Sequence, residues 1–153
     1  MPRFTSITPR ARHAAAIIAL AGAALGSAAF AQQPAAAAAT AGPLPAAQTQ
    51  GALRYACGGI GIDESTAMRA AMKDHPLSLL FAAAGGAYQA DVQVTLRPEG
   101  QGAGQPLTFT ANGPICLLTV PAGTYAVEAS ANGQQKRQSV TVGQGAKTLD
   151  FRF

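Results

Sequence analysis

The chain has 153 residues, of which 48% are hydrophobic, and it carries 11 basic against 7 acidic side chains. Three of the basic residues lie within the first twelve positions, and the rest of the chain is left with eight basic and seven acidic residues. A net charge of +1 after removal of that segment gives no support to binding of nucleic acid or of an anionic membrane surface.

The first 31 residues predict a secretory signal peptide. They open with Arg3, Arg10 and Arg12, continue through an apolar core at 14–25, and end at the small-x-small site Ala29-Phe30-Ala31. The apolar core is short for a transmembrane helix and is interrupted by glycine. We therefore expect export to the periplasm, a mature chain that starts at Gln32, and no integral membrane segment after signal removal.

Residues 32–53 consist mainly of Ala, Pro, Gln, Thr and Gly, and they carry no charge. Such a composition buries too little apolar surface to offset the entropy lost on ordering, which predicts a disordered linker. The remaining residues, 54–153, are numerous enough for one domain with a single core.

One helix is expected, from Asp63 to Asp74, ahead of the strands. Asp63 is a suitable N-cap residue and Pro76 ends the helix. The apolar residues fall at the spacing of one buried face: Ala67, Met68, Ala71 and Met72.

Seven short strands separated by turn residues are then expected. They are 77–84, 88–97, 106–111, 115–120, 124–131, 135–142 and 147–153. Within 88–97, Ala90, Val92, Val94 and Leu96 alternate with polar residues, as in a strand with one face in water. The pattern predicts an all-β fold, a seven-stranded β-sandwich preceded by one short N-terminal helix.

The stretch from 113 to 127, GPICLLTVPAGTYAV, is the centre of this prediction. Pro121 ends an apolar strand, and Gly123 is expected to adopt a positive φ in the turn that follows. Tyr125 opens the next strand on its apolar face. We expect this aromatic side chain to lock the corner where the two sheets meet.

An apolar strand followed by P-x-G-x-Y-x-V resembles the signature of carboxypeptidase-regulatory-like domains, which are small transthyretin-like (prealbumin-like) β-sandwiches. The matching residues are Leu118, Val120, Pro121, Gly123, Tyr125 and Val127, with Ala122 where the family usually has a second proline. Two further stretches, around 55–61 and 86–92, are similar to small exported Gram-negative proteins with this domain and no assigned activity. The resemblance spans 55–153 and implies a fold without implying a reaction.

The two cysteines, Cys57 and Cys116, predict one disulfide in an exported chain, with two buried free thiols as the alternative. Without histidines nearby they do not suggest a zinc site. Asp91 is a candidate polar residue, either satisfying backbone donors at a strand crossing or lining a ligand surface.

Ser65, Asp74 and His75 include the residue types of a nucleophilic triad, but their sequence positions do not place them together. We therefore expect no catalytic residues, no metal and no cofactor. The sequence favours a non-enzymatic periplasmic module that binds an envelope partner or has a structural role. Two alternatives remain: a hydrolase or metal-dependent enzyme whose site the sequence hides, and an outer-membrane-associated protein, suggested by the terminal Leu149-x-Phe151-x-Phe153.

Overall fold

The computed structural model describes residues 42–100 and 104–153. The expected signal peptide and the first part of the expected linker, 32–41, lie outside the described residues. No helix among those that are described is long and apolar enough to span a membrane.

The described residues form nine strands, one α-helix and one 3₁₀ turn. In chain order these are β1 Gln48–Gln50, β2 Leu53–Gly58, α1 Ile62–Ala71, η1 Met72–Asp74, β3 Leu77–Ala82, β4 Val92–Glu99, β5 Leu107–Ala111, β6 Ile115–Thr119, β7 Gly123–Ala131, β8 Gln134–Val142 and β9 Lys147–Arg152.

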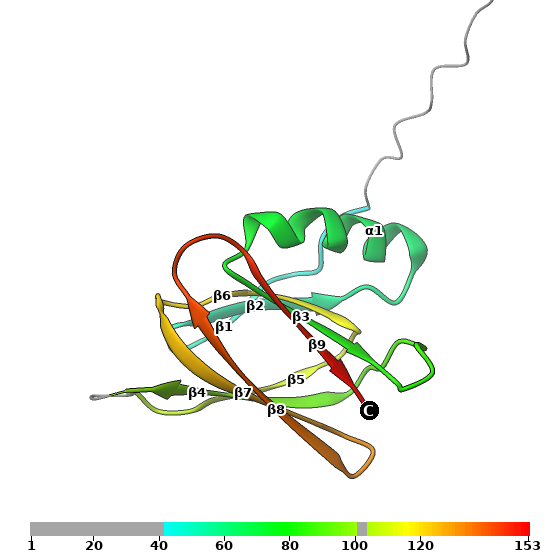
Figure 1. Cartoon of the computed structure of the whole chain (residues 1–153). Helices are drawn as coiled ribbons and strands as arrows, with labels where there is room; N and C mark the ends of the chain where they lie inside the picture. Colours follow the sequence, from blue (N-terminus) through cyan, green and yellow to red (C-terminus); the bar gives the residue numbers. More distant parts are fainter. Residues whose placement is uncertain (1–41, 101–103) are drawn as a thin grey trace, which may run out of the picture. The chain divides into compact units, whose positions relative to one another are not determined.

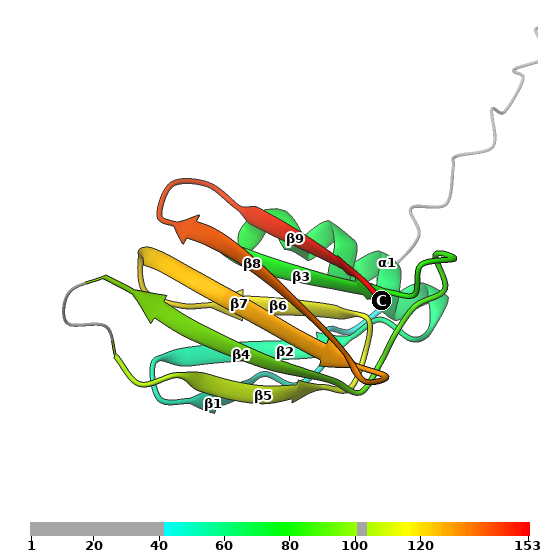
Figure 2. The same cartoon turned by 60° about the horizontal axis from the view of Figure 1, so that its bottom comes forward.

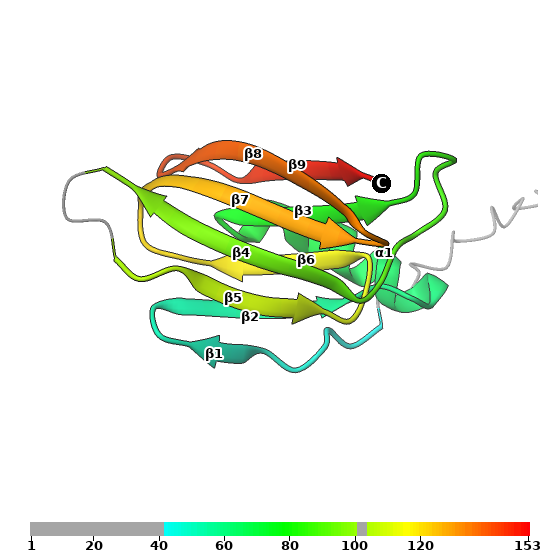
Figure 3. The ribbon, with the colours of Figure 1, turned by 90° about the horizontal axis from the view of Figure 1, so that it is seen from below.

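The strands form two sheets that face each other as a β-sandwich (Figures 1 to 3). Sheet A has the order β1-β2-β6-β3-β9, and sheet B has the order β5-β4-β7-β8. Neighbouring strands are antiparallel except β3 and β9, which run parallel. The all-β sandwich expected from the alternating strands is therefore present.

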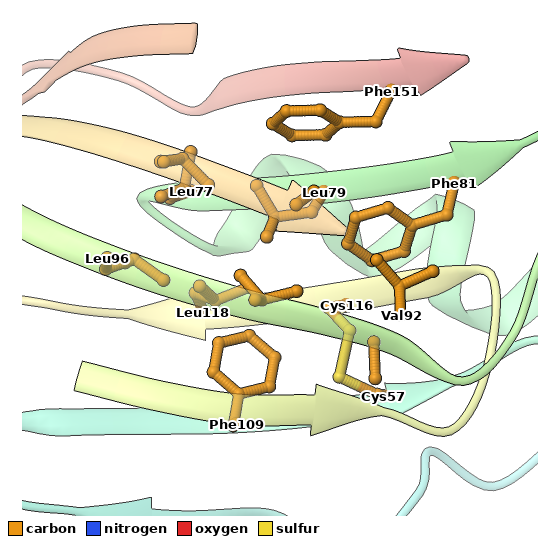
Figure 4. Packing of buried hydrophobic residues seen from close by; sticks show 14 of the residues in the cluster. Cys57, Leu77, Leu79, Phe81, Val92, Leu96, Phe109, Cys116, Leu118 and Phe151 are labelled. Atoms are coloured by element: carbon orange, nitrogen blue, oxygen red, sulfur yellow. A yellow bond between two sulfur atoms is a disulfide. The ribbon is translucent and has the colours of Figure 1, made fainter. Parts of the chain in front are cut away.

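Between the sheets lies one continuous hydrophobic core (Figure 4). Leu79, Val94 and Leu118 are fully buried in it. The rings of Phe81 and Phe151 stack with centroids 5.8 Å apart, and those of Tyr55 and Phe109 are 4.3 Å apart. Each aromatic pair links two different strands, so side-chain packing holds the strands together beyond their backbone hydrogen bonds.

Strand β6 is apolar from Ile115 to Leu118 because both of its faces are covered there. Cys116 and Leu118 face the core between the sheets, whereas Ile115 and Leu117 form a second cluster with Met68 of α1. Figure 1 shows α1 lying across sheet A on the side away from sheet B. A strand buried on both faces needs no polar alternation, which explains the uninterrupted apolar run.

The expected count of seven strands is wrong for the described residues, which form nine. The two additional strands are β1 and β2, which pair with each other, and β2 also pairs with β6. The helix also does not precede the sandwich, because β1 and β2 come before it in the chain.

The expected linker boundary at residue 53 is also wrong. Residues 48–50 form strand β1, which pairs with β2 in the register Gln48↔Tyr55. Leu53 is fully buried in the core. The β1 residues are polar and exposed, so burial gives them no reason to form a strand, and they do so because β2 offers an unpaired backbone edge to pair with.

Candidate functional site

A disulfide joins Cys57 of β2 to Cys116 of β6, as expected from the even number of cysteines. The two residues are direct partners in the antiparallel register, with their Cα atoms 4.1 Å apart (Figure 4). Both are buried, at 6% and 0% exposure. The bond therefore ties together two neighbouring strands of sheet A inside the core, and it is a structural element.

The corner between β6 and β7 is held by Tyr125. Its side chain is 5% exposed, and its hydroxyl donates a hydrogen bond of 2.8 Å to the carbonyl oxygen of Pro121. Burial raises the pKa of the Tyr125 phenol above its ordinary value. The ring fills the core while the hydroxyl fixes the path of the chain four residues earlier.

Gly123, in the same corner, has the positive φ that we expected. Its φ is +159°, and a Cβ there would meet only the Tyr125 ring at 3.7 Å, so the backbone conformation and not the space favours glycine. At Gly113 the space is the reason, because a Cβ would lie 2.4 Å from the backbone oxygen of Gly58. The turn therefore requires Gly123, and the close approach of two backbones requires Gly113.

The start of α1 is stabilised by Glu64, and the expected cap residue Asp63 makes no such contact. The N-cap position is Gly61, which has no capping side chain. One carboxylate oxygen of Glu64 accepts hydrogen bonds from the backbone N–H groups of Gly59, at 2.8 Å, and Ile60, at 3.3 Å. This carboxylate holds the glycine-rich segment against the first turn of the helix.

The structure does not bring Ser65, Asp74 and His75 together into a catalytic arrangement. The Ser65 hydroxyl donates to the carbonyl of Ile62 within the first helical turn. No hydrogen bond connects the three side chains in the described part of the chain. Within those ranges there is also no group of three or more metal-ligating side chains.

Asp91 lies exposed immediately before β4, with a φ of +57°. Aspartate tolerates this left-handed conformation better than most residues do. Its carboxylate appears in no hydrogen bond or ion pair among the described residues. The structure places it at a bend, and it lines neither of the two hollows described below.

Two hollows on the surface are large enough to consider as binding sites. A cavity of about 570 Å³ lies at the β6–β7 corner, between Tyr125, Pro98 and the β1–β2 turn. A second hollow of about 430 Å³, here called the helix groove, lies on the outer face of sheet A beside the end of η1. Apolar residues Leu44, Pro45, Ala56 and Leu117 line the helix groove together with Arg54 and His75.

A third surface feature is the free edge of β8 near the β7–β8 turn, here called the hairpin edge, Gln134–Arg137. All four residues are exposed, and β8 is the last strand of sheet B. Figure 1 shows this end of the hairpin projecting from the body of the sandwich. The hairpin edge therefore presents unpaired backbone groups together with the cationic side chains of Lys136 and Arg137.

Sequence reasoning did not identify the helix groove, because one of its walls is formed by residues assigned to a linker. Leu44 and Leu53 were the available signal, since they are the bulky apolar side chains in that segment. The hairpin turn at Asn132-Gly133 was recognisable in the sequence. Which side of β8 remains unpaired depends on the strand order of sheet B.

Comparison with known proteins does not add a family to these observations. The chain matches no protein-family model, and it matches none of the curated proteins searched.

Proposed function

We propose that this protein is a non-enzymatic binding or structural module of the bacterial periplasm that holds a protein partner at the hairpin edge. The module has a transthyretin-like fold of the carboxypeptidase-regulatory-like type. The P-x-G-x-Y stretch supports the fold assignment, because its tyrosine occupies the corner and binds the carbonyl of the proline in that motif.

The observation that carries the proposal is the long edge strand β8. It has nine residues, of which the first four are exposed, and it pairs on one side only, with β7. An unpaired strand edge provides backbone donors and acceptors that a strand from a partner can use. Further along β8 the edge is partly occupied, because the Gln138 side chain donates to the carbonyl of Asp150 at 2.8 Å. The exposed portion is thus the hairpin edge itself.

The charge of the hairpin edge defines the kind of partner. Lys136 and Arg137 lie at its end, and Arg137 lies 3.4 Å from Glu99 and 3.7 Å from Glu128. Lys136 takes part in none of the ion pairs among the described residues. A partner segment that pairs here in an extended conformation should therefore carry an acidic residue close to Lys136.

The experiment is site-specific photo-crosslinking in the native periplasm. A benzophenone amino acid is placed at position 136, with a matched control at Thr108 on β5, the opposite edge of sheet B. We expect a discrete adduct from position 136 and none from position 108. Equal adducts from both positions, or none from either, would contradict partner binding at the hairpin edge.

The periplasmic location is tested independently by the processing of the chain. Material isolated from the exported fraction should begin at Gln32. Exported protein that still begins at Met1 would show that the first 31 residues are not a cleaved signal.

A further inference from the structure

The helix groove differs from the rest of the surface of sheet A because its floor is apolar at one end and polar at the other. Ala56 of β2 pairs with Leu117 of β6, and the next pair on the same face is Arg54 with Thr119. These four residues all line the groove. An elongated ligand on this floor therefore contacts apolar side chains at one end and the guanidinium of Arg54 at the other.

The walls of the groove are held in place by contacts elsewhere in the fold. On one side, Pro45 packs so closely on β2 that a Cβ at Gly58 would lie 2.6 Å from its ring. On the other side, His75 follows η1, whose end is fixed by the hydrogen bond from the His75 backbone N–H to Met72. The rim residue Leu44 is 47% exposed, which leaves apolar surface facing the hollow. The walls of the groove are thus fixed by contacts within the fold.

The polar groups of the groove select the charge of the ligand. None of the described residues that line it is acidic. The four ion pairs of the described chain use Arg97, Arg137 and Arg152, and none includes Arg54. Among the described residues, Arg54 is therefore the cationic side chain of the groove that is free to bind an anionic group.

The position of the helix decides where the charge of the ligand lies. The helix and its 3₁₀ extension end next to His75, and the carbonyl groups at a helix C-terminus carry partial negative charge. An anionic group is therefore disfavoured at His75 and favoured at Arg54, where a carboxylate can accept two hydrogen bonds from the guanidinium. The volume of about 430 Å³ is within the range of small-molecule sites.

From this arrangement we propose that the helix groove binds a free aliphatic monocarboxylate, with the carboxylate on Arg54 and the hydrocarbon chain against Leu44, Pro45 and Ala56. The proposal does not depend on the hairpin edge, which lies on the other sheet.

The test uses octanoate as the probe, with octan-1-ol and octylammonium as ligands of equal chain length and different charge. Binding to the mature chain is followed by two-dimensional amide NMR. We expect saturable shifts at residues 54–56 and 117–119 with octanoate, weaker shifts with octan-1-ol, and none with octylammonium. Shifts confined to other residues, or equal affinity for the three probes, would overturn the proposal.

Two variants test separately the charge of Arg54 and the open space of the helix groove. Arg54→Gln should weaken octanoate about tenfold or more and change octan-1-ol little, because one charge-assisted contact is lost. Arg97→Gln on sheet B is the matched control and should leave both affinities unchanged. Thr119→Phe keeps a good strand former at an exposed position but fills the groove, so it should abolish binding of both probes. Unchanged octanoate affinity in either Arg54→Gln or Thr119→Phe would refute the assignment.

Discussion

The outer faces of the two sheets differ in what covers them. On sheet A, Ile115 and Leu117 are covered by α1 and pack with Met68, and all three are at most 1% exposed. On sheet B, the outer face lies in water and carries hydroxyl pairs across the strands, such as Thr95 with Thr108 at 3.2 Å and Thr124 with Thr141 at 3.1 Å. The layers of the described fold are therefore α1, sheet A and sheet B, and only sheet A has a helix packed on its outer face (Figure 1).

This difference explains two sequence patterns that look unrelated. Strand β6 is apolar on both sides because a helix covers its second face, whereas β4 and β7 alternate because theirs is solvated. The stability of sheet A should then depend on contacts on both of its faces. The stability of sheet B should depend almost entirely on its inner face, and substitutions can test that contrast.

The largest effect is expected at Tyr125, which anchors sheet B from its inner face. Tyr125→Ala removes a buried aromatic side chain and should lower the free energy of unfolding by roughly 3–5 kcal/mol. Tyr125→Phe keeps the ring but loses the hydrogen bond to Pro121, and it should cost about 1 kcal/mol. Urea melts of the two variants measure separately the contributions of the buried ring and of the hydrogen bond to the free energy of unfolding. If Tyr125→Ala is as stable as wild type, the corner does not anchor sheet B.

The pH dependence of stability gives an independent measure of the same residue. Burial raises the pKa of Tyr125 above its ordinary value near 10, so the unfolded chain loses the phenolic proton first. Stability should therefore decline as the pH rises above about 10, and this part of the decline should disappear in Tyr125→Phe. An identical alkaline decline in wild type and Tyr125→Phe would assign it to other groups.

The disulfide is expected to make the next largest contribution to the free energy of unfolding, and both of its cysteines lie in sheet A. It closes a loop with a sequence separation of 59. In the chain-entropy model, replacing Cys57 and Cys116 together by alanine should cost about 4 kcal/mol, less any strain that is released. The unreduced protein, unfolded and exposed to a thiol reagent, should show no labelling before reduction. Equal urea midpoints for wild type and the double variant would show that sheet A does not rely on this bond.

The contact between helix and sheet is tested at Met68. Met68→Ala should cost about 2–5 kcal/mol, because a fully buried side chain is lost from the outer cluster of sheet A. Thr66→Ala, exposed on the same helix, is the matched control and should change stability by less than about 0.5 kcal/mol. If Met68→Ala and Thr66→Ala have the same unfolding midpoint, α1 is a loosely attached element and the outer face of sheet A is not a second core.

Two glycines of the central stretch are expected to be required for different reasons. Gly113→Ala places a Cβ against the backbone of Gly58 and should cost roughly 1–3 kcal/mol, since one backbone must move. Gly123→Ala has room beside the Tyr125 ring, but its φ of +159° is one that L side chains rarely adopt, so it should cost about 1 kcal/mol or more. Thermal melts in which either variant is as stable as wild type would contradict the assignment for that glycine.

The smallest effect is expected on the open face of sheet B. Glu128 lies 3.3 Å from Arg97 and 3.7 Å from Arg137, and exposed pairs of this type contribute less than about 1 kcal/mol. Glu128→Ala should therefore be nearly neutral in urea melts, and its effect should shrink further at high salt. A loss comparable to that of Met68→Ala would mean that the outer face of sheet B is structurally as important as that of sheet A.

Much of the strand content was predictable from the sequence, because alternation and turn chemistry are local signals. Val92, Val94 and Leu96 are fully buried in β4, whereas Ala90, expected on the same face, lies before the strand. The cysteine pair was predictable from the even number of cysteines together with the expected export. The Glu64 contacts to Gly59 and Ile60 are local, and they were missed because the cap was assigned to Asp63. The helix groove was not predictable, because its walls come from segments that lie together only when the chain has folded.

The sequence by itself determined those elements that are favoured by the hydrophobic pattern and the backbone preferences of their own residues. The apolar run of β6, the alternation of β7 and the proline-terminated helix belong to this set, since burial and backbone preference are properties of neighbouring residues. Tertiary structure alone decided the fate of 48–50, whose polar side chains have no strand pattern and which pair because β2 leaves an edge open. It also decided that Gly113 must be a glycine, because Gly113 meets Gly58 across 55 positions of sequence separation. Contacts between distant residues are set by how the layers pack, and no local pattern contains that information.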